Sequence, residues 1–256
     1  MTQNEKRSFL IRELINENPH YDNMDIPSDK DSQWQLFRSL LNVRPPKPMS
    51  DEFIQIQNEY LTEEIRKAGI TDLNSLTPVR KQIYLWKGDI TTLCVDAVVN
   101  AANSQMLGCF VPCHGCIDNA IHTFAGLQLR LACAYMMQVQ GKPEETGTAE
   151  ITPAFNLPSR YVIHTVGPIV SSRLTKQDCE LLSSCYRSCL ELADKKTLKS
   201  IAFCCISTGE FHFPNKKAAE IAVDTVTNYI ENTQSGIKVI FNVFKENDYE
   251  IYRRIL

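Results

Sequence analysis

Three cysteines and two histidines are concentrated in residues 108–122, GCFVPCHGCIDNAIH, whereas the other cysteines of the chain stand singly or in pairs. Thiolates and imidazoles are the usual protein ligands of zinc, so this grouping favours a metal site over core filling. Three protein ligands leave a coordination position open for water or substrate, and four close the site into a structural one. The number of protein ligands therefore separates a catalytic metal site from a structural one.

A carboxylate follows this stretch closely. Asp118 is placed to orient or deprotonate a water molecule beside a metal, or else to cap the start of a helix, a role for which Asn119 is a rival. His122 falls four residues after Asp118 and on the same helical face, as a partner for a metal ligand or as a structural histidine. We expect the structural role, buried and hydrogen-bonded, for His122, and a structural role for His164.

The elements that must position these side chains alternate between short apolar runs and amphipathic stretches from Lys81 onward, which is typical of an α/β domain. The pattern predicts strands near residues 82–86, 95–101, 147–152, 160–166, 199–205 and 237–244. It predicts helices near residues 118–139, 175–194, 215–231 and 246–255.

Ligands of open α/β sheets bind outside the carboxyl ends of the strands, so the loops that follow the strands are the places to look. LWKGDIT puts Asp89 after the first strand, where it could bind a ligand or simply cap a short turn. DAVVNAANSQMLG ends a strand with Asn100 and Asn103, whose amides suit ribose hydroxyls but also suit turns.

A third loop, in CCISTGEFHFPNKKAAEIA, opens from a buried strand into Ser207, Thr208 and Gly209 and then leads into a helix past Pro214. Backbone amides, hydroxyls and a glycine that allows close approach make this the layout of a phosphate-binding loop. The loop lacks the lysine of a Walker motif, which argues against a nucleoside triphosphatase.

The first 78 residues show helical spacing without chemistry. Apolar side chains share one face at Phe9, Leu10, Leu14 and Ile15, and again at Trp34, Phe37, Leu40 and Leu41. We expect Ser32 to cap the second of these helices, and a third helix over residues 51–67 to end at Gly69. The chain therefore divides into a helical N-terminal extension, residues 1–78, and an α/β domain, residues 79–256.

Composition limits the class of protein. The chain has 256 residues, 43% of them hydrophobic and 22% charged, which fits a soluble chain with a substantial core. It has no apolar run of about 18 residues and no signal-peptide pattern, so we expect a cytoplasmic protein with reduced thiols that does not enter a membrane. A net charge of −3 argues against nucleic acid as a partner and favours a small ligand, free or carried by another protein.

Five segments, GDIT, VDAVVNAANS, IDNAIHTFAG, YVIHTVGP and ISTGEFHFP, together resemble the macrodomains, the ADP-ribose-binding fold. The resemblance implies a three-layer α/β/α fold with a mixed central sheet. IDNAIHTFAG resembles the segment with the catalytic acidic residue of MacroD-type hydrolases, which is Asp118 here. CFVPCHGC departs from those relatives and resembles zinc-containing macrodomains, a microbial group often encoded beside a sirtuin-like ADP-ribosyltransferase and a lipoylated carrier protein.

The resemblance also assigns roles around ADP-ribose. Asp89 would accept a hydrogen bond from the adenine amino group, with the Ile90 amide alongside, and Asn103 would orient the distal ribose. Phe244 and Asn247 would lie near the adenine. The pyrophosphate would be wrapped mainly by the amides of Ser207, Thr208, Gly209, Glu210 and Phe211.

The family's metal pattern, CFxPxHxC, implies Zn²⁺ held by Cys109, His114 and Cys116, with one position open. Cys113 lies within the same loop and would make a closed Cys3His site. We favour the open site because Cys113 directly precedes His114, so both would face one metal only in a strained loop. The loop also adjoins the expected distal-ribose pocket.

The resemblance thus implies a zinc-dependent hydrolase that removes mono-ADP-ribose from a modified protein, possible targets including the lipoylated carrier protein. An O-acetyl-ADP-ribose deacetylase would use the same pocket. A reader with a structural zinc would bind ADP-ribose without turnover. Processing of poly-ADP-ribose is the most remote alternative, because nothing in the sequence indicates a groove for a polymer.

Overall fold

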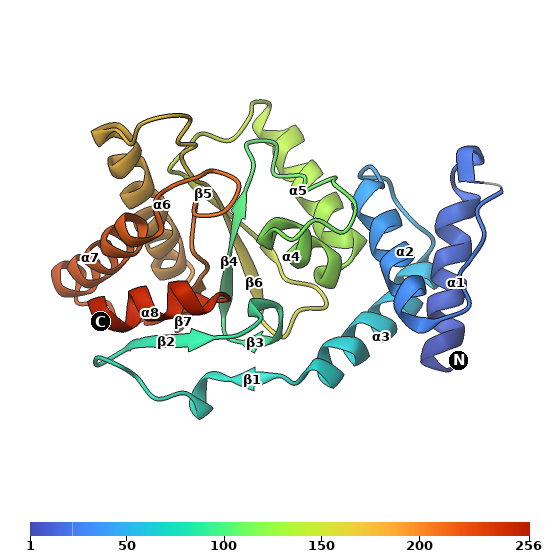
Figure 1. The fold of residues 1–256 in the computed structure, drawn as a ribbon, viewed down its shortest axis with the longest axis horizontal. Coiled ribbons are helices and arrows are strands. Elements are labelled where there is room, and N and C mark those ends of the chain that lie inside the picture. The colour runs from blue at the N-terminus through green and yellow to red at the C-terminus, as the bar shows by residue number, and fades with distance from the viewer. Residues whose placement is uncertain (22) are drawn as a thin grey trace.

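A six-stranded mixed sheet forms the centre of the computed structural model, which describes residues 1–21 and 23–256 (Figure 1). Its strand order is β2-β8-β7-β4-β6-β5, with β5 antiparallel to β6 and the other neighbouring strands parallel. The strands are β2 (Ile83–Lys87), β4 (Ala97–Ala102), β5 (Ala149–Pro153), β6 (Tyr161–Val166), β7 (Ser200–Phe203) and β8 (Lys238–Val243). Two short strands, β1 (Thr71–Asp72) and β3 (Leu93–Cys94), pair separately.

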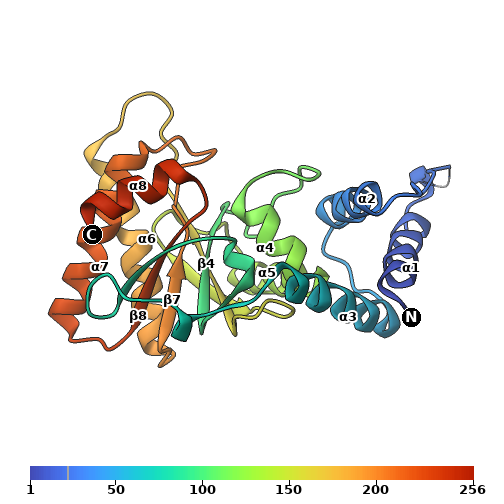
Figure 2. The same ribbon diagram turned by 60° about the horizontal axis from the view of Figure 1, so that its bottom comes forward.

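Helices cover both faces of this sheet (Figure 2). One side carries α4 (Ile117–Ala125) and α5 (Leu127–Gln140), and the other carries α6 (Lys176–Lys195), α7 (Asn215–Thr233) and α8 (Glu246–Ile255). Central parallel strands covered on both faces are mostly apolar, and Val98 and Val99 of β4 are indeed fully buried. The expected three-layer α/β/α fold with a mixed sheet is confirmed.

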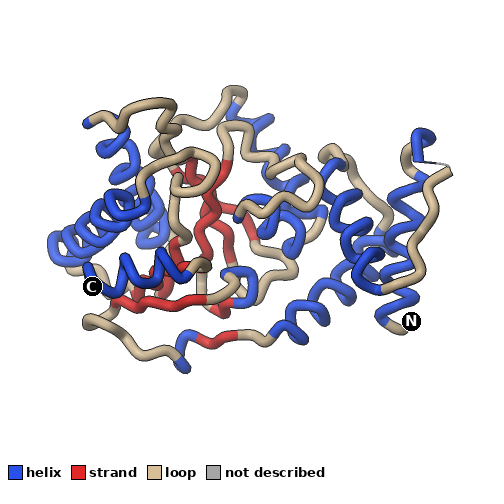
Figure 3. The backbone as a smooth tube through the Cα atoms, in the orientation of Figure 1, coloured by secondary structure: helices blue, strands red, loops and turns tan. Residues whose placement is uncertain are grey.

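The parallel strands bring their carboxyl ends to one edge of the sheet. The loops after β2, β4, β7 and β8 therefore gather there, drawn in tan beyond the red strands in Figure 3. These are the loops that the sequence marks for ligand binding, and the longest segment without regular structure among them, residues 103–116, joins β4 to α4.

Three helices precede the sheet: α1 (Gln3–Asn16), α2 (Lys30–Val43) and α3 (Asp51–Ala68). They bury a small core of their own, formed by Leu10, Ile11, Leu14, Ile15, Phe37, Leu40, Leu41, Phe53, Tyr60 and Leu61. Leu127 of α5 belongs to the same cluster, and the Trp34 ring lies 5.6 Å from that of Phe124 in α4. The N-terminal helices thus pack on the α4–α5 side of the α/β domain.

The described ranges also hold three short 3-10 helices, η1 (Pro19–Tyr21), η2 (Leu73–Ser75) and η3 (Ile90–Thr92). Each expected strand and helix of the α/β domain is present, with ends shifted by a few residues. Every helix in the described ranges is too short or too polar to span a lipid bilayer.

Two sequence expectations need correction. The predicted helix over residues 118–139 is interrupted at Gly126, whose φ of +90° turns the chain between α4 and α5. The cap of α2 is Asp29, which accepts a hydrogen bond from the Ser32 amide, so Ser32 lies inside the first turn instead of capping it. The end of α3 at Gly69 is as expected.

Candidate active site

The loop between β4 and α4 brings Cys109, His114 and Cys116 together. Each offers one ligand atom, and these three atoms all lie within 4.8 Å of one another. Cys109 Sγ is 3.6 Å from His114 Nδ1. Gly108 starts the loop at a φ of +81°, and a Cβ there would meet the His122 ring at 2.7 Å, so the tight entry requires glycine.

Cys113 lies outside this cluster as the structure describes it. Its sulfur donates to the Gln35 carbonyl at 3.3 Å and lies 3.2 Å from Ser39 Oγ, both in α2. Its backbone has a φ of +51°, the left-handed conformation that turns consecutive side chains apart. The geometry therefore groups three candidate ligands, and the side chain of the fourth candidate, Cys113, points toward the N-terminal helices.

The donor set and its surroundings fit a zinc ion. Burial, together with nearby Cys109 and Asp118, raises the pKa of the Cys116 thiol to about 12, so the thiol is neutral when no cation is near. A bound cation reverses this preference and holds the sulfur as thiolate. Two sulfurs and one imidazole are the soft ligands that zinc prefers, and their partial exposure leaves room for a further ligand.

Asp118 is buried in the first turn of α4, facing the end of β4. Its Oδ1 accepts a hydrogen bond from Asn100 Nδ2 at 2.8 Å, and its Oδ2 lies 3.5 Å from Asn103 Nδ2. Burial raises the pKa of Asp118 to about 6, against the opposing effects of Asn100 and Arg130. The helix cap is Cys116, whose sulfur accepts from the Asn119 amide, so the capping alternatives for Asp118 and Asn119 are wrong.

Two buried histidines lie behind Asp118. Asn100 and Thr152 contact the two ring nitrogens of His164, at 3.2 and 2.9 Å, as expected for a structural histidine. His122 is buried too, with Nε2 3.6 Å from Asp118 Oδ1. Among the described residues neither of its ring nitrogens has a hydrogen-bond partner, so the expected bonding of His122 is wrong. Cys133 completes a second group of ligand-type atoms with these rings, sealed inside the core.

The loop after β7 presents free backbone donors. Its shape is set by bonds from the Phe213 amide to the Ser207 carbonyl and from the His212 amide to the Gly209 carbonyl. Across the ranges that the structure describes, the amides of Ser207, Gly209, Glu210 and Phe211 donate no hydrogen bond. A turn of unpaired amides is an anion-binding arrangement. Nothing lies within 4 Å of where a Cβ of Gly209 would stand, so this side of the turn is open.

The β4–α4 loop, residues 103–116, is called the metal loop because it carries the candidate ligands. It meets the loop after β7 at one pair of side chains. His114 Nε2 lies 3.5 Å from a Glu210 carboxylate oxygen. An imidazole that binds a metal through one nitrogen commonly gives its other N–H to a carboxylate. The pair therefore joins the three-ligand cluster to the anion-binding turn.

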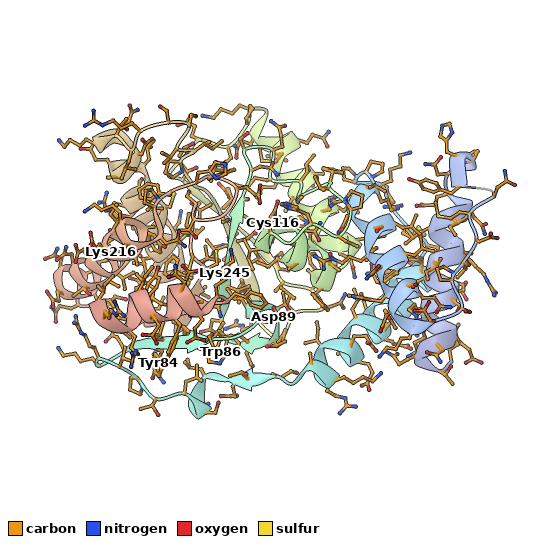
Figure 4. All side chains as sticks on the ribbon, viewed as in Figure 1. Tyr84, Trp86, Asp89, Cys116, Lys216 and Lys245 are labelled. Carbon is orange, nitrogen blue, oxygen red and sulfur yellow. The ribbon has the colours of Figure 1, made fainter. Side chains whose placement is uncertain are left out.

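Asp89 caps η3 by accepting a hydrogen bond from the Thr91 amide at 2.9 Å, which is the capping role that the sequence predicts as one alternative. Asp89 is exposed. The Gly88 amide bonds to the Val243 carbonyl, which brings the ends of β2 and β8 together. Asp89 and Lys245 accordingly lie near each other in Figure 4, and Cys116 lies farther along the same edge of the sheet. Phe244, beside Lys245, has 76% of its side chain exposed.

The residues expected to touch a ligand thus lie along one edge, from Asp89 through Asn103 to the Ser207–Phe211 turn. A model of the Macro domain matches residues 99–222. A protein-ADP-ribose hydrolase of Treponema medium is 58% identical over 260 residues and covers all of both chains. The chain belongs to the macrodomain family.

Solved macrodomains show the same fold. The Trypanosoma brucei macrodomain in complex with ADP-ribose has a TM-score of 0.66 at 30% identity, covering 85% of this chain and 94% of that one. The Oceanobacillus iheyensis macrodomain with ADP has a TM-score of 0.63 at 38% identity, covering 70% and 93%.

Three site residues escaped the sequence analysis. Asn100, expected to serve a turn or a ribose hydroxyl, is instead fully buried and holds Asp118; its signal is a polar side chain inside an otherwise apolar strand. Arg130 and Arg38 donate to carbonyls of the metal loop from α5 and α2. Arginines in helices usually lie on the surface, and nothing in the local sequence distinguishes Arg38 and Arg130 from those.

Proposed function

We propose that this macrodomain removes mono-ADP-ribose from modified protein side chains and releases ADP-ribose, with a zinc ion held by Cys109, His114 and Cys116. One observation carries the proposal: the three-ligand cluster and the partly buried Asn103–Asp118 pair lie on the same loop and helix start, at the edge where the anion-binding turn ends. The names of relatives support the same activity, the protein-ADP-ribose hydrolase of Treponema medium among them.

Different residues would bind the different parts of ADP-ribose. The Ser207–Phe211 amides would hold the pyrophosphate, Asp89 and the Ile90 amide the adenine, and Asn103 the distal ribose. The solved macrodomain with ADP-ribose supports this class of ligand. This arrangement would place the bond between ribose and protein beside Asp118.

Asp118 has the properties of a general base for water. Its raised pKa of about 6 lies close to neutral pH, where a base both accepts a proton readily and is still largely ionised. Asn100 fixes one carboxylate oxygen and leaves the other toward Asn103. When bound, zinc would supply a positive charge that polarises the linkage next to this carboxylate.

The test is release of ADP-ribose from a panel of mono-ADP-ribosylated proteins, a lipoylated carrier protein among them, with bound zinc measured in each sample. We expect Cys116→Ala to lose zinc and turnover together, because two remaining ligands hold zinc poorly. Cys179→Ala, on α6, is the matched control and should keep both. A zinc-free Cys116→Ala protein with wild-type turnover would overturn the metal assignment.

Other outcomes point to the other candidate functions. Faster release of acetate from O-acetyl-ADP-ribose than of ADP-ribose from any modified protein would indicate a deacetylase. Binding of zinc and ADP-ribose without turnover on the whole panel would indicate a reader. The three-membered cluster favours the hydrolase over the reader, because the fourth cysteine faces α2.

A further inference from the structure

The N-terminal helix α2 lies against α4 and the metal loop (Figure 1). Arg38 of α2 donates from Nη2 to the carbonyl of His114 at 2.8 Å. Its Nη2 and Nε also donate to Asn119 Oδ1, at 2.6 and 3.0 Å. Asn119 in turn donates to the Val111 carbonyl at 2.9 Å. One guanidinium therefore links a candidate ligand to the helix turn that follows Cys116.

The middle of the loop is held by the same helix. Asn42, almost fully buried, accepts a hydrogen bond from the Cys113 amide at 2.9 Å and donates to Thr123 at 3.0 Å. The Cys113 sulfur bonds to the Gln35 carbonyl. The residue that directly precedes His114 is thus fixed to α2 through both its backbone and its side chain.

The start of the loop is held through Arg130, a buried arginine of α5. Its Nη1 donates to three carbonyls at the end of α2, those of Leu41, Asn42 and Arg44, at 3.0, 2.8 and 2.6 Å. Its Nε donates to the Leu107 carbonyl at 2.7 Å, and its Nη2 lies 3.5 Å from that of Cys109. Arg130 therefore joins the end of α2 to the first candidate ligand.

Elsewhere the loop is held at Ser104, whose carbonyl accepts from the Glu144 amide, at Met106, which is buried, and at Val111, whose carbonyl accepts from Asn119. Residues 103–116 contain no helix or strand, and the described backbone bonds within the loop are those from Met106 to Asn103 and from His114 to Val111. Ligands on a loose chain must be ordered when the metal binds, which lowers metal affinity. The contacts from α2 to Cys113 and His114 remove part of that cost in advance.

We propose that α2 presets the three-ligand geometry, with Arg38 as the positioning residue that fixes His114. The inference rests on the zinc site of the proposed function. The N-terminal extension is then part of the metal site and does more than cover one side of the domain. Partners that orient metal ligands commonly change metal affinity about 10-fold to 100-fold when removed.

The experiment measures zinc affinity of the full-length protein by chelator competition, and the spectrum of the Co²⁺-substituted protein, for wild type and Arg38→Met. We expect about 10-fold to 100-fold weaker zinc binding in Arg38→Met and a shifted Co²⁺ ligand-field band. Arg12→Met changes an exposed arginine of α1 and is the matched control, expected to keep wild-type affinity. Circular dichroism of the zinc-free proteins checks that each variant is folded.

Arg38→Lys keeps the charge and one donor for the His114 carbonyl but loses the paired bonds to Asn119. We expect its zinc affinity to fall between wild type and Arg38→Met, and it decides the question if Arg38→Met does not fold. Wild-type affinity and spectrum in the folded Arg38 variants would overturn the role of Arg38 and leave the proposed hydrolase standing. A wild-type chain that binds no zinc would overturn both the role of Arg38 and the zinc assignment of the proposed function.

Discussion

At the scale of single residues, the candidate site holds a carboxyl group whose surroundings act on its pKa in opposite directions. Asp118 is buried, so its charged form is disfavoured, yet Asn100 donates to one oxygen and so supports that form. The outcome is a pKa of about 6, close to neutral pH. Burial therefore makes the proposed base more basic, and Asn100 fixes its orientation.

We predict that Asp118→Asn lowers the turnover of mono-ADP-ribosylated protein about 10²-fold to 10⁴-fold, because the amide cannot accept the proton. ADP-ribose binding should change little, since the anion-binding turn and Asp89 lie on other loops. Calorimetry with ADP-ribose, zinc analysis and turnover are measured on the same samples. Asp224→Asn, an exposed carboxylate of α7, is the control. Full turnover by Asp118→Asn would exclude a role for this carboxylate as base.

Residue types were enough to predict a metal-binding loop within residues 108–122, because soft ligands are concentrated there. The choice of Cys109, His114 and Cys116 came from the resemblance to zinc-containing macrodomains. Arg38 could not be found this way, because its partner Asn119 is 81 residues away. The direction of the Cys113 side chain depends on one left-handed backbone angle that no local pattern records.

At the scale of elements, the predicted strands and helices are present because apolar periodicity encodes burial directly. The break at Gly126 was missed because apolar residues continue in helical spacing on both sides of it. A Cβ at Gly126 would stand 2.5 Å from the Gln57 side chain of α3. Tertiary packing, and not the local pattern, therefore places the boundary between α4 and α5.

Strands β4, β5 and β6 enclose His164, and this predicts a pH dependence of stability. Burial lowers the pKa of His164 from 6.5 to about 4, so the unfolded chain takes up the proton first as the pH falls. The contribution of His164 to the free energy of unfolding is full above pH 6.5 and is lost toward pH 4, by about 3 kcal/mol.

Urea unfolding of wild type and His164→Gln between pH 7 and about pH 4 measures this contribution. These two pH limits bracket the shift in the pKa of His164 from 6.5 to about 4. We expect a shallower decline for His164→Gln, because that variant has no imidazole to protonate on unfolding. His20→Gln replaces an exposed histidine and should follow wild type. Parallel declines in all three proteins would contradict the assignment.

At the scale of the whole molecule, two apolar cores lie side by side. The smaller core of α1, α2 and α3 includes Leu127 of α5, and Trp34 packs near Phe124 of α4. Buried hydrogen bonds of Arg130 and Asn42 cross the same boundary. The described contacts therefore indicate one cooperative unit, although the sequence divides the chain at residue 78.

The two tryptophans of the chain report on the two parts, Trp34 on the helices and Trp86 on the sheet. We predict that Phe53→Ala, which empties a fully buried position of the smaller core, lowers the free energy of unfolding by about 3 kcal/mol. Single-tryptophan variants followed by fluorescence should show the same loss from both reporters. A transition of Trp86 that stays at its original urea concentration would indicate two independent domains.

The bonds that hold the metal loop also constrain the order of events during synthesis. Arg38 is separated from Asn119 by 81 positions, and Arg130 from the end of α2 by 86 to 89. At about 5 to 20 residues per second, a ribosome needs roughly 4 to 18 s to make these stretches. The apolar faces of the helices made first therefore stay uncovered until α4 and α5 emerge, and the proposed zinc site can take its preset geometry only after that interval.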